Sequence, residues 1–162
     1  MKIRTVSLCL IRRGDEILVE ETIDTNVDKT FYRPIGGTVE YGESSKETVK
    51  REVREEIDAE ITDPKLVFVI ENIFKYLDQI GHEIDFIYEA KLSDINLYNK
   101  DVIDGIEGET KYKAVWKPLF DFTNNPREKL VPDGLLELLI NKNDEETSVI
   151  KHKGTSLASQ RR

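Results

Sequence analysis

The alternation of apolar and polar residues predicts a chain built mainly from β-strands. The first expected strand, residues 3–12, turns back at Arg13–Asp15 into a second, residues 16–22. Later strands are expected at 59–62, 66–74, 82–91, 113–118 and 148–152. In residues 82–91, Ile84, Phe86, Tyr88 and Ala90 alternate with Glu83, Asp85, Ile87 and Glu89, which predicts a half-buried strand.

Proline and glycine set the limits of these strands. Pro34 argues against a central strand at residues 31–35, and Pro64 is expected to end the strand at 59–62. Residues 92–111 contain Gly105 and Gly108 and show no clear pattern, so they are expected to form a loop.

Two helices are expected between the strands. In the first, Ser44 and Glu47 have the spacing of a capping box, and Val49, Val53 and Ile57 recur every four residues as an apolar stripe. The second covers residues 132–141, with proline in its first turn. Strands, a helix, more strands and a second helix predict a mixed α+β sandwich in one domain, residues 1–152. The small, polar and basic segment 153–162 is expected to be a flexible tail.

The first helix carries three glutamates, Glu52, Glu55 and Glu56, at positions i, i+3 and i+4. One interpretation is a solvated face on which Arg51 pairs with Glu47 and Glu55. The other is a site for a divalent cation, because Mg²⁺ prefers carboxylate oxygens and is often completed by substrate phosphates. The helix alone leaves both interpretations open.

The longer string around this helix resembles the Nudix box, G-x5-E-x7-R-E-U-x-E-E-x-G-U, in which U is a bulky apolar residue. Gly37 opens it, Glu43 follows, and Arg51-Glu52-Val53 and Glu55-Glu56-Ile57 complete the matching positions. Two positions depart, with Asp58 where the family has glycine and Ala59 where it has a larger apolar residue. Asp tolerates the left-handed conformation expected at a helix end better than most residues do.

The resemblance implies an α/β/α sandwich with a mixed central sheet and a metal-dependent hydrolase. It implies that Glu55 and Glu56 bind Mg²⁺ or Mn²⁺, with help from Glu52 and the Gly37 carbonyl, that Arg51 orients the glutamates, and that Glu43 has a supporting structural role. Family members often carry another carboxylate before a Trp-containing strand, and Glu107 and Glu109 are the candidates before Trp116. We therefore expect Glu52, Arg51 and Glu109 to be catalytic, and the choice of general base lies between Glu52 and Glu109.

The implied substrate is a nucleoside diphosphate linked to another moiety: a nucleotide sugar, a dinucleoside polyphosphate, or a normal or oxidised nucleoside triphosphate. We expect Tyr32, Arg33 and Phe74 to contact it, because aromatic faces can stack a nucleobase. Such aromatic residues are also common in cores.

The composition of the chain argues against several other classes of function. A net charge of −8 over 162 residues argues against general nucleic-acid binding. Cys9 is the only cysteine and lies in an apolar run, which indicates packing rather than disulfide or nucleophile chemistry. No apolar run or leader suggests a membrane or export, so a cytoplasmic protein is expected, and homodimers are common in the resembled family.

Two further hypotheses belong to other classes. The first is a non-catalytic Nudix domain that senses a nucleotide ligand or serves as an interaction module, although such domains usually lose acidic residues of the box. The second is a structural protein with a charged helix, which would tolerate changes of glutamate to glutamine.

Overall fold

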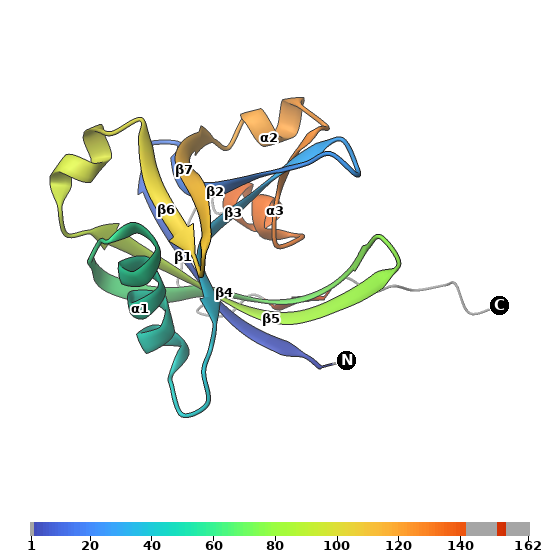
Figure 1. The fold of residues 1–162 in the computed structure, drawn as a ribbon, viewed down its shortest axis with the longest axis horizontal. Helices are drawn as coiled ribbons and strands as arrows, with labels where there is room; N and C mark the ends of the chain where they lie inside the picture. Colours follow the sequence, from blue (N-terminus) through green and yellow to red (C-terminus); the bar gives the residue numbers. More distant parts are fainter. Residues whose placement is uncertain (1, 142–151, 155–162) are drawn as a thin grey trace.

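The computed structural model describes residues 2–141 and 152–154 of the chain, and Figure 1 shows a mixed sheet flanked by helices. The elements in chain order are β1 (Arg4–Arg13), β2 (Glu16–Asp24), β3 (Lys29–Thr38), α1 (Ser45–Ile57), β4 (Ile61–Tyr76), β5 (Gln79–Leu92), the 3-10 helix η1 (Ile95–Asn99), β6 (Val102–Glu107), β7 (Thr110–Pro118), α2 (Asp121–Asn124), β8 (Glu128–Leu130), α3 (Leu135–Ile140) and β9 (His152–Gly154).

Strand β1 lies near the middle of the sheet, whose order is β6-β7-β2-β3-β1-β5-β4-β9. It runs parallel to β5, with Arg4 opposite Glu83, and antiparallel to β3, with Cys9 opposite Ile35. The β2–β3 and β4–β5 hairpins project to the same side of the molecule, away from α1 (Figure 1). The sheet is therefore mixed, as predicted.

Two apolar clusters hold the layers together. The stripe of α1, formed by Val49, Val53 and Ile57, is buried in the first cluster with Ile35 and Trp116. The second cluster lies on the other side of the sheet and contains the following residues of the strands, α2 and α3: Val6, Leu8, Leu10, Ile17, Val19, Tyr32, Phe68, Ile70, Ile87, Phe122, Leu130, Leu135 and Leu139. Helices thus pack on both sides, which confirms the predicted α/β/α sandwich.

Both ends of α1 match the sequence. Ser44 accepts from the Glu47 amide while the Glu47 carboxylate accepts from the Ser44 amide, which is a complete capping box. At the other end Asp58 is left-handed, with φ 51° and ψ 45°. Asp58 therefore ends the helix in the conformation that the family's glycine would adopt.

The expectation at Pro34 was wrong, because β3 is an interior strand between β2 and β1. Pro34 lies opposite Val19 at the end of the β2 pairing, and the pairing with β1 begins at the next residue, Ile35. Because β3 changes partners at this point, the missing amide of proline interrupts neither ladder in its middle.

Pro64 does not end a strand either. Strand β4 runs through it, and the register with β5 shifts between Thr62 and Lys65 and again between Leu66 and Phe68. The proline falls in the first of these irregularities, where a ladder hydrogen bond is not required.

Residues 92–111 are more ordered than predicted, since they contain η1, β6 and the start of β7. Gly105, which suggested a loop, is a strand residue opposite Tyr112. A Cβ at position 105 would lie 2.4 Å from the Tyr112 ring, so glycine makes room for this tyrosine.

The C-terminal expectations are only partly covered by the described residues. Helix α3 begins at Leu135, after Gly134, and is shorter than the expected 132–141. His152, Lys153 and Gly154 form β9, parallel to β4, so the first two residues assigned to the tail are in a strand. Residues 148–151 of the expected edge strand and 155–162 of the tail lie outside the described residues.

Candidate active site

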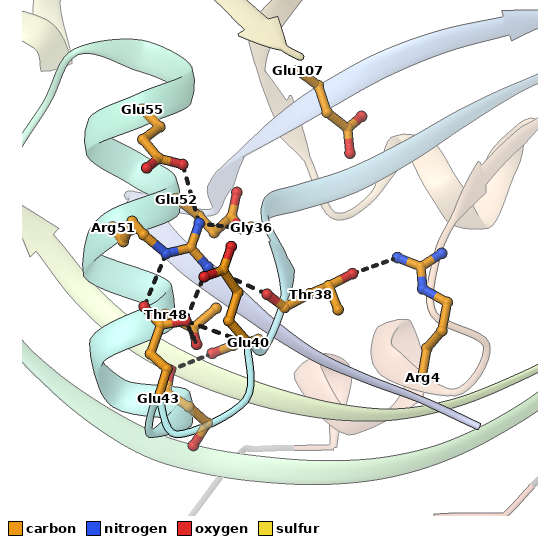
Figure 2. Close-up of polar contacts among 12 residues, drawn as sticks. Arg4, Gly36, Thr38, Glu40, Glu43, Thr48, Arg51, Glu52, Glu55 and Glu107 are labelled. Atoms are coloured by element: carbon orange, nitrogen blue, oxygen red, sulfur yellow. Dashed lines mark hydrogen bonds and ion pairs between the residues drawn. The ribbon is translucent and has the colours of Figure 1, made fainter. Parts of the chain in front are cut away.

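Arg51 is the centre of the polar network on α1 (Figure 2). Its Nε and Nη2 donate to the Glu43 carboxylate at 2.9 and 3.0 Å, and its Nη1 donates to Glu52 at 2.8 Å and Glu55 at 3.0 Å. Nη2 also reaches the Thr38 carbonyl at 3.3 Å. One guanidinium group therefore ties the helix to the loop that precedes it.

The hydrogen bonds between Arg51 and Glu43 lower the pKa of Glu43 and raise that of Arg51. The two hydrogen bonds from Arg51 lower the pKa of Glu43 to about 2, and Thr48 adds a third at 2.7 Å. In return, the hydrogen bond to Glu43 is the main cause of a raised Arg51 pKa. Glu43 is thus an anion that holds the Arg51 guanidinium in place through two charge-assisted hydrogen bonds.

Glu56 has a different environment, because it is only 4% exposed. Tyr112 on β7 donates to its Oε2 at 2.5 Å, while Oε1 is buried and has no hydrogen-bond partner. Burial raises the pKa of Glu56 to about 8. A buried carboxylate oxygen without a partner is costly unless a cation or a donor meets it.

The glycine pair at the end of β3 fits closely against its neighbours. A Cβ at Gly36 would lie 2.0 Å from the Ser7 carbonyl oxygen on β1. A Cβ at Gly37 would lie 2.5 Å from Glu52 Oε1. Gly36 therefore allows the sheet to close, and Gly37 makes the space in which the Glu52 carboxylate sits.

Among the described residues, no three acidic, histidine or cysteine side chains are gathered tightly enough to form a ready metal cluster. Arg51 Nη1 bonds both Glu52 and Glu55 and so compensates their charges. The residues nevertheless fit a hard cation, because they supply carboxylate oxygens only and include the unpartnered Oε1 of Glu56.

A cavity of about 670 Å³ is bounded by the β2–β3 hairpin, the β4–β5 hairpin and residues 129–133, and none of its lining residues belongs to α1. Arg33 lies on its wall and donates to Glu20 at 3.2 Å, to the Gly36 carbonyl at 3.3 Å and to Glu107 at 3.4 Å. Burial lowers the Arg33 pKa, but Glu20, Glu107 and Glu56 together outweigh this effect, and the pKa is raised. Arg33 is thus a fixed cation between the cavity and Glu56.

The other expected substrate contacts differ in position. Phe74 lines the cavity, whereas Tyr32 is 3% exposed and packs edge-on against Phe122, 5.5 Å away between ring centres. Tyr32 is therefore placed in the core, outside the cavity lining. Of the two carboxylates before Trp116, Glu107 lines the cavity, while Glu109 is exposed on the turn between β6 and β7.

The sequence analysis missed Tyr112, Asn72 and Asp85. Asp85 was placed on a solvent-facing side of its strand, yet it and Ile87 are buried, so both faces of β5 are covered. The apolar Ile87 on the nominally polar face was the available signal, as was Asn72 within the apolar run of β4. Tyr112 gave no signal, because its contact with Glu56 spans 56 residues of sequence.

The mixed sheet with helices on both sides agrees with the family comparison. The family model described as NUDIX domain matches residues 1–133. The chain belongs to the Nudix family. The prediction of a Nudix hydrolase is thereby confirmed at the level of the family.

Solved structures show the same fold at low sequence identity. An ADP-ribose pyrophosphatase from Streptococcus suis 89-1591 is 14% identical, with a TM-score of 0.59 over 93% of this chain and 98% of that one. A MutT NUDIX hydrolase from Burkholderia pseudomallei is 19% identical, with a TM-score of 0.55 over 74% and 86%. The E. coli ORF135 protein is 23% identical, with a TM-score of 0.54 over 86% and 90%. No helix in the described part of this Nudix chain is long and apolar enough to cross a membrane.

Proposed function

We propose that this protein hydrolyses a phosphoanhydride bond in a nucleoside diphosphate linked to another moiety, with the help of a divalent cation. The observation that carries the proposal is the Glu56 carboxylate, which is buried with one oxygen unpartnered and is electrostatically influenced by Glu52 and by Arg33 and Glu107 of the cavity wall. A solvated charged face would not bury a glutamate in this way.

Glu52, Glu55, Glu56 and the Gly37 carbonyl are the groups that would hold the cation. A bound Mg²⁺ or Mn²⁺ supplies charge neutralisation on the phosphates and a more acidic water. The side chains of the protein would hold the cation ligands in place. Arg51 fixes Glu52 and Glu55 by hydrogen bonds of 2.8 and 3.0 Å, so loss of either contact would let that carboxylate rotate.

Arg33 is the residue we assign to the phosphates of the substrate. Its guanidinium lies between the glutamates and the cavity and stays charged, and a planar guanidinium suits paired phosphate oxygens. Glu107, at 3.4 Å from Arg33, is better placed than Glu109 to assist the reaction. For the general base we favour Glu52, which lies against Gly37.

The cavity supports a substrate that extends beyond the phosphates, because it reaches from Arg33 to Phe74 along both hairpins. This extension suits a nucleotide sugar, a dinucleoside polyphosphate, or a normal or oxidised nucleoside triphosphate. The similar fold of an ADP-ribose pyrophosphatase is consistent with this substrate class. A cytoplasmic location and a homodimer stay predictions.

Glutamine variants of the helix test the proposal. Glu55→Gln and Glu56→Gln each remove one anionic ligand and should lower kcat by about 10²-fold or more, since a metal-held transition state loses several kcal/mol of stabilisation. Glu60→Gln is the matched control, because Glu60 is exposed and its carboxylate forms an ion pair with Arg54 on the protein surface. Full activity in both of the first two variants would exclude the assigned site.

A further inference from the structure

Two polar side chains at the floor of the cavity have no assigned partner. Asp85 on β5 is 1% exposed and Asn72 on β4 is 4% exposed. Asp85 Oδ2 and Asn72 Oδ1 are both buried without a hydrogen-bond partner, and both residues line the cavity. Buried oxygens of this kind are rare, because an unmet acceptor costs about 1–3 kcal/mol.

The neighbours of Asp85 do not account for its burial. Val6 on β1 and Ile70 on β4 lie opposite it in the sheet. Glu83, two residues before it, is already paired with Arg4 at 3.2 Å. Burial raises the pKa of Asp85 to about 7, and Arg33 and Arg4 offset this only in part. Burial of the Asp85 carboxylate therefore destabilises the folded protein, and no contact within the described residues fully offsets this cost.

The position of Asn72 and Asp85 in the cavity indicates which kind of ligand would hydrogen-bond to them. Arg33, the residue assigned to the phosphates, and Glu107 line the same cavity as Asn72 and Asp85, which lie on the two strands of the β4–β5 hairpin. Phe74, on the same face of β4 as Asn72, offers a ring for stacking, and its ring also packs over Gly81. This arrangement combines an aromatic face with acceptor oxygens, as a nucleobase site requires.

We propose that Asp85 and Asn72 select a nucleobase that presents adjacent N–H donors, the pattern of the guanine edge; this inference rests on the proposed function. A carboxylate can accept two parallel N–H groups, as it does from arginine. Guanine offers a ring N–H beside an exocyclic amine. Hypoxanthine lacks that amine, and adenine places an acceptor nitrogen beside its amine, so each leaves an Asp85 oxygen unmet.

Binding of nucleoside monophosphates tests the inference without any hydrolysis, because they contain no anhydride. By titration calorimetry with Mg²⁺ present, GMP should bind at least about 10-fold more tightly than IMP or AMP, since hydrogen bonds to a charged group contribute about 1.5–3 kcal/mol each. Asp85→Asn should weaken the binding of GMP by about 10-fold or more and reduce the preference for GMP over IMP and AMP. Asn72→Leu, which keeps the volume, should weaken GMP as well.

Asp101→Asn is the matched control, because Asp101 is exposed and lies outside the cavity. Equal affinities for GMP, IMP and AMP, no binding of GMP, or unchanged discrimination in a folded Asp85→Asn protein would each overturn the inference. Anhydride hydrolysis without base preference would leave the proposed function standing and remove this inference alone. Discrimination by Asp85 without hydrolysis of any anhydride would support the inference and remove the catalytic proposal.

Discussion

At the scale of single residues, the site depends on two hydrogen-bonding side chains that are not themselves proposed metal ligands. Arg51 connects Glu43, Glu52 and Glu55, and Tyr112 holds one oxygen of Glu56 at 2.5 Å. Arg51 and Tyr112 each restrain the orientation of the carboxylates that they contact. Such supporting hydrogen bonds fix the orientation of ligands, and their loss typically costs 10–100-fold in metal affinity.

Tyr112→Phe tests this supporting role. The change removes only the hydroxyl that donates to Glu56 Oε2, so Glu56 is left with both oxygens unpaired. We expect affinity for Mg²⁺ or Mn²⁺, measured by titration calorimetry, to fall by about 10-fold or more. Tyr41→Phe, at a fully exposed tyrosine, should bind like the unmodified protein. Wild-type affinity in Tyr112→Phe would show that Tyr112 has no role in positioning Glu56.

At the scale of elements, the meeting of β3 with β1 and α1 builds the site. The adjacent glycines at the end of β3 face different neighbours, since Gly36 approaches the backbone of β1 and Gly37 approaches Glu52 of α1. The same short segment therefore closes the sheet and shapes the glutamate cluster.

Alanine at each glycine should separate these two effects. Gly36→Ala would force a Cβ to 2.0 Å from the Ser7 backbone, so we expect a loss of stability of several kcal/mol or failure to fold. In Gly37→Ala the three atoms nearest the new Cβ all belong to the Glu52 side chain, which can move. This variant should fold, as shown by circular dichroism, but lose most of its activity. Gly37→Ala with full activity would argue against a role for Glu52 at this position.

Much of this element structure could be predicted from local patterns. The capping box at Ser44, the stripe of Val49, Val53 and Ile57, and the left-handed Asp58 are all set by neighbours in sequence. The errors at Pro34 and Pro64 arose where a strand changes partner or register, which only the tertiary structure reveals. The glutamates were singled out by the resemblance of their string to the Nudix box, whereas Tyr112, Asn72 and Asp85 depend on contacts between separate elements of the fold.

At the scale of the whole molecule, the β2–β3 and β4–β5 hairpins, which project away from α1 (Figure 1), supply most of the residues that line the cavity. Tyr76 near the tip of β4 donates to Asp24 at the end of β2, so a hydrogen bond joins the two hairpins. The buried Asp85 at the floor makes the stability of the molecule depend on pH, because its charged form is disfavoured in the folded state.

The sign of this dependence follows from its raised pKa. The unfolded Asp85 ionises near 3.8 and the folded one near 7, so the stability it contributes is complete below about pH 4 and is lost as pH rises to 7. In urea titrations, the free energy of unfolding of Asp85→Asn minus that of wild type should therefore rise by on the order of 2–4 kcal/mol from pH 4 to pH 8. A difference that does not change with pH would show that Asp85 ionises normally in the folded protein.

The most direct test of the whole account is a substrate panel run with Mg²⁺, with Mn²⁺ and with chelator. The panel contains nucleotide sugars, dinucleoside polyphosphates, and normal and oxidised nucleoside triphosphates, and release of phosphate or nucleotide is measured. We predict cleavage of one of these classes that requires the metal and stops with chelator. Cleavage of none of them by folded protein, whether or not it binds metal, would contradict the account and favour a non-catalytic ligand sensor.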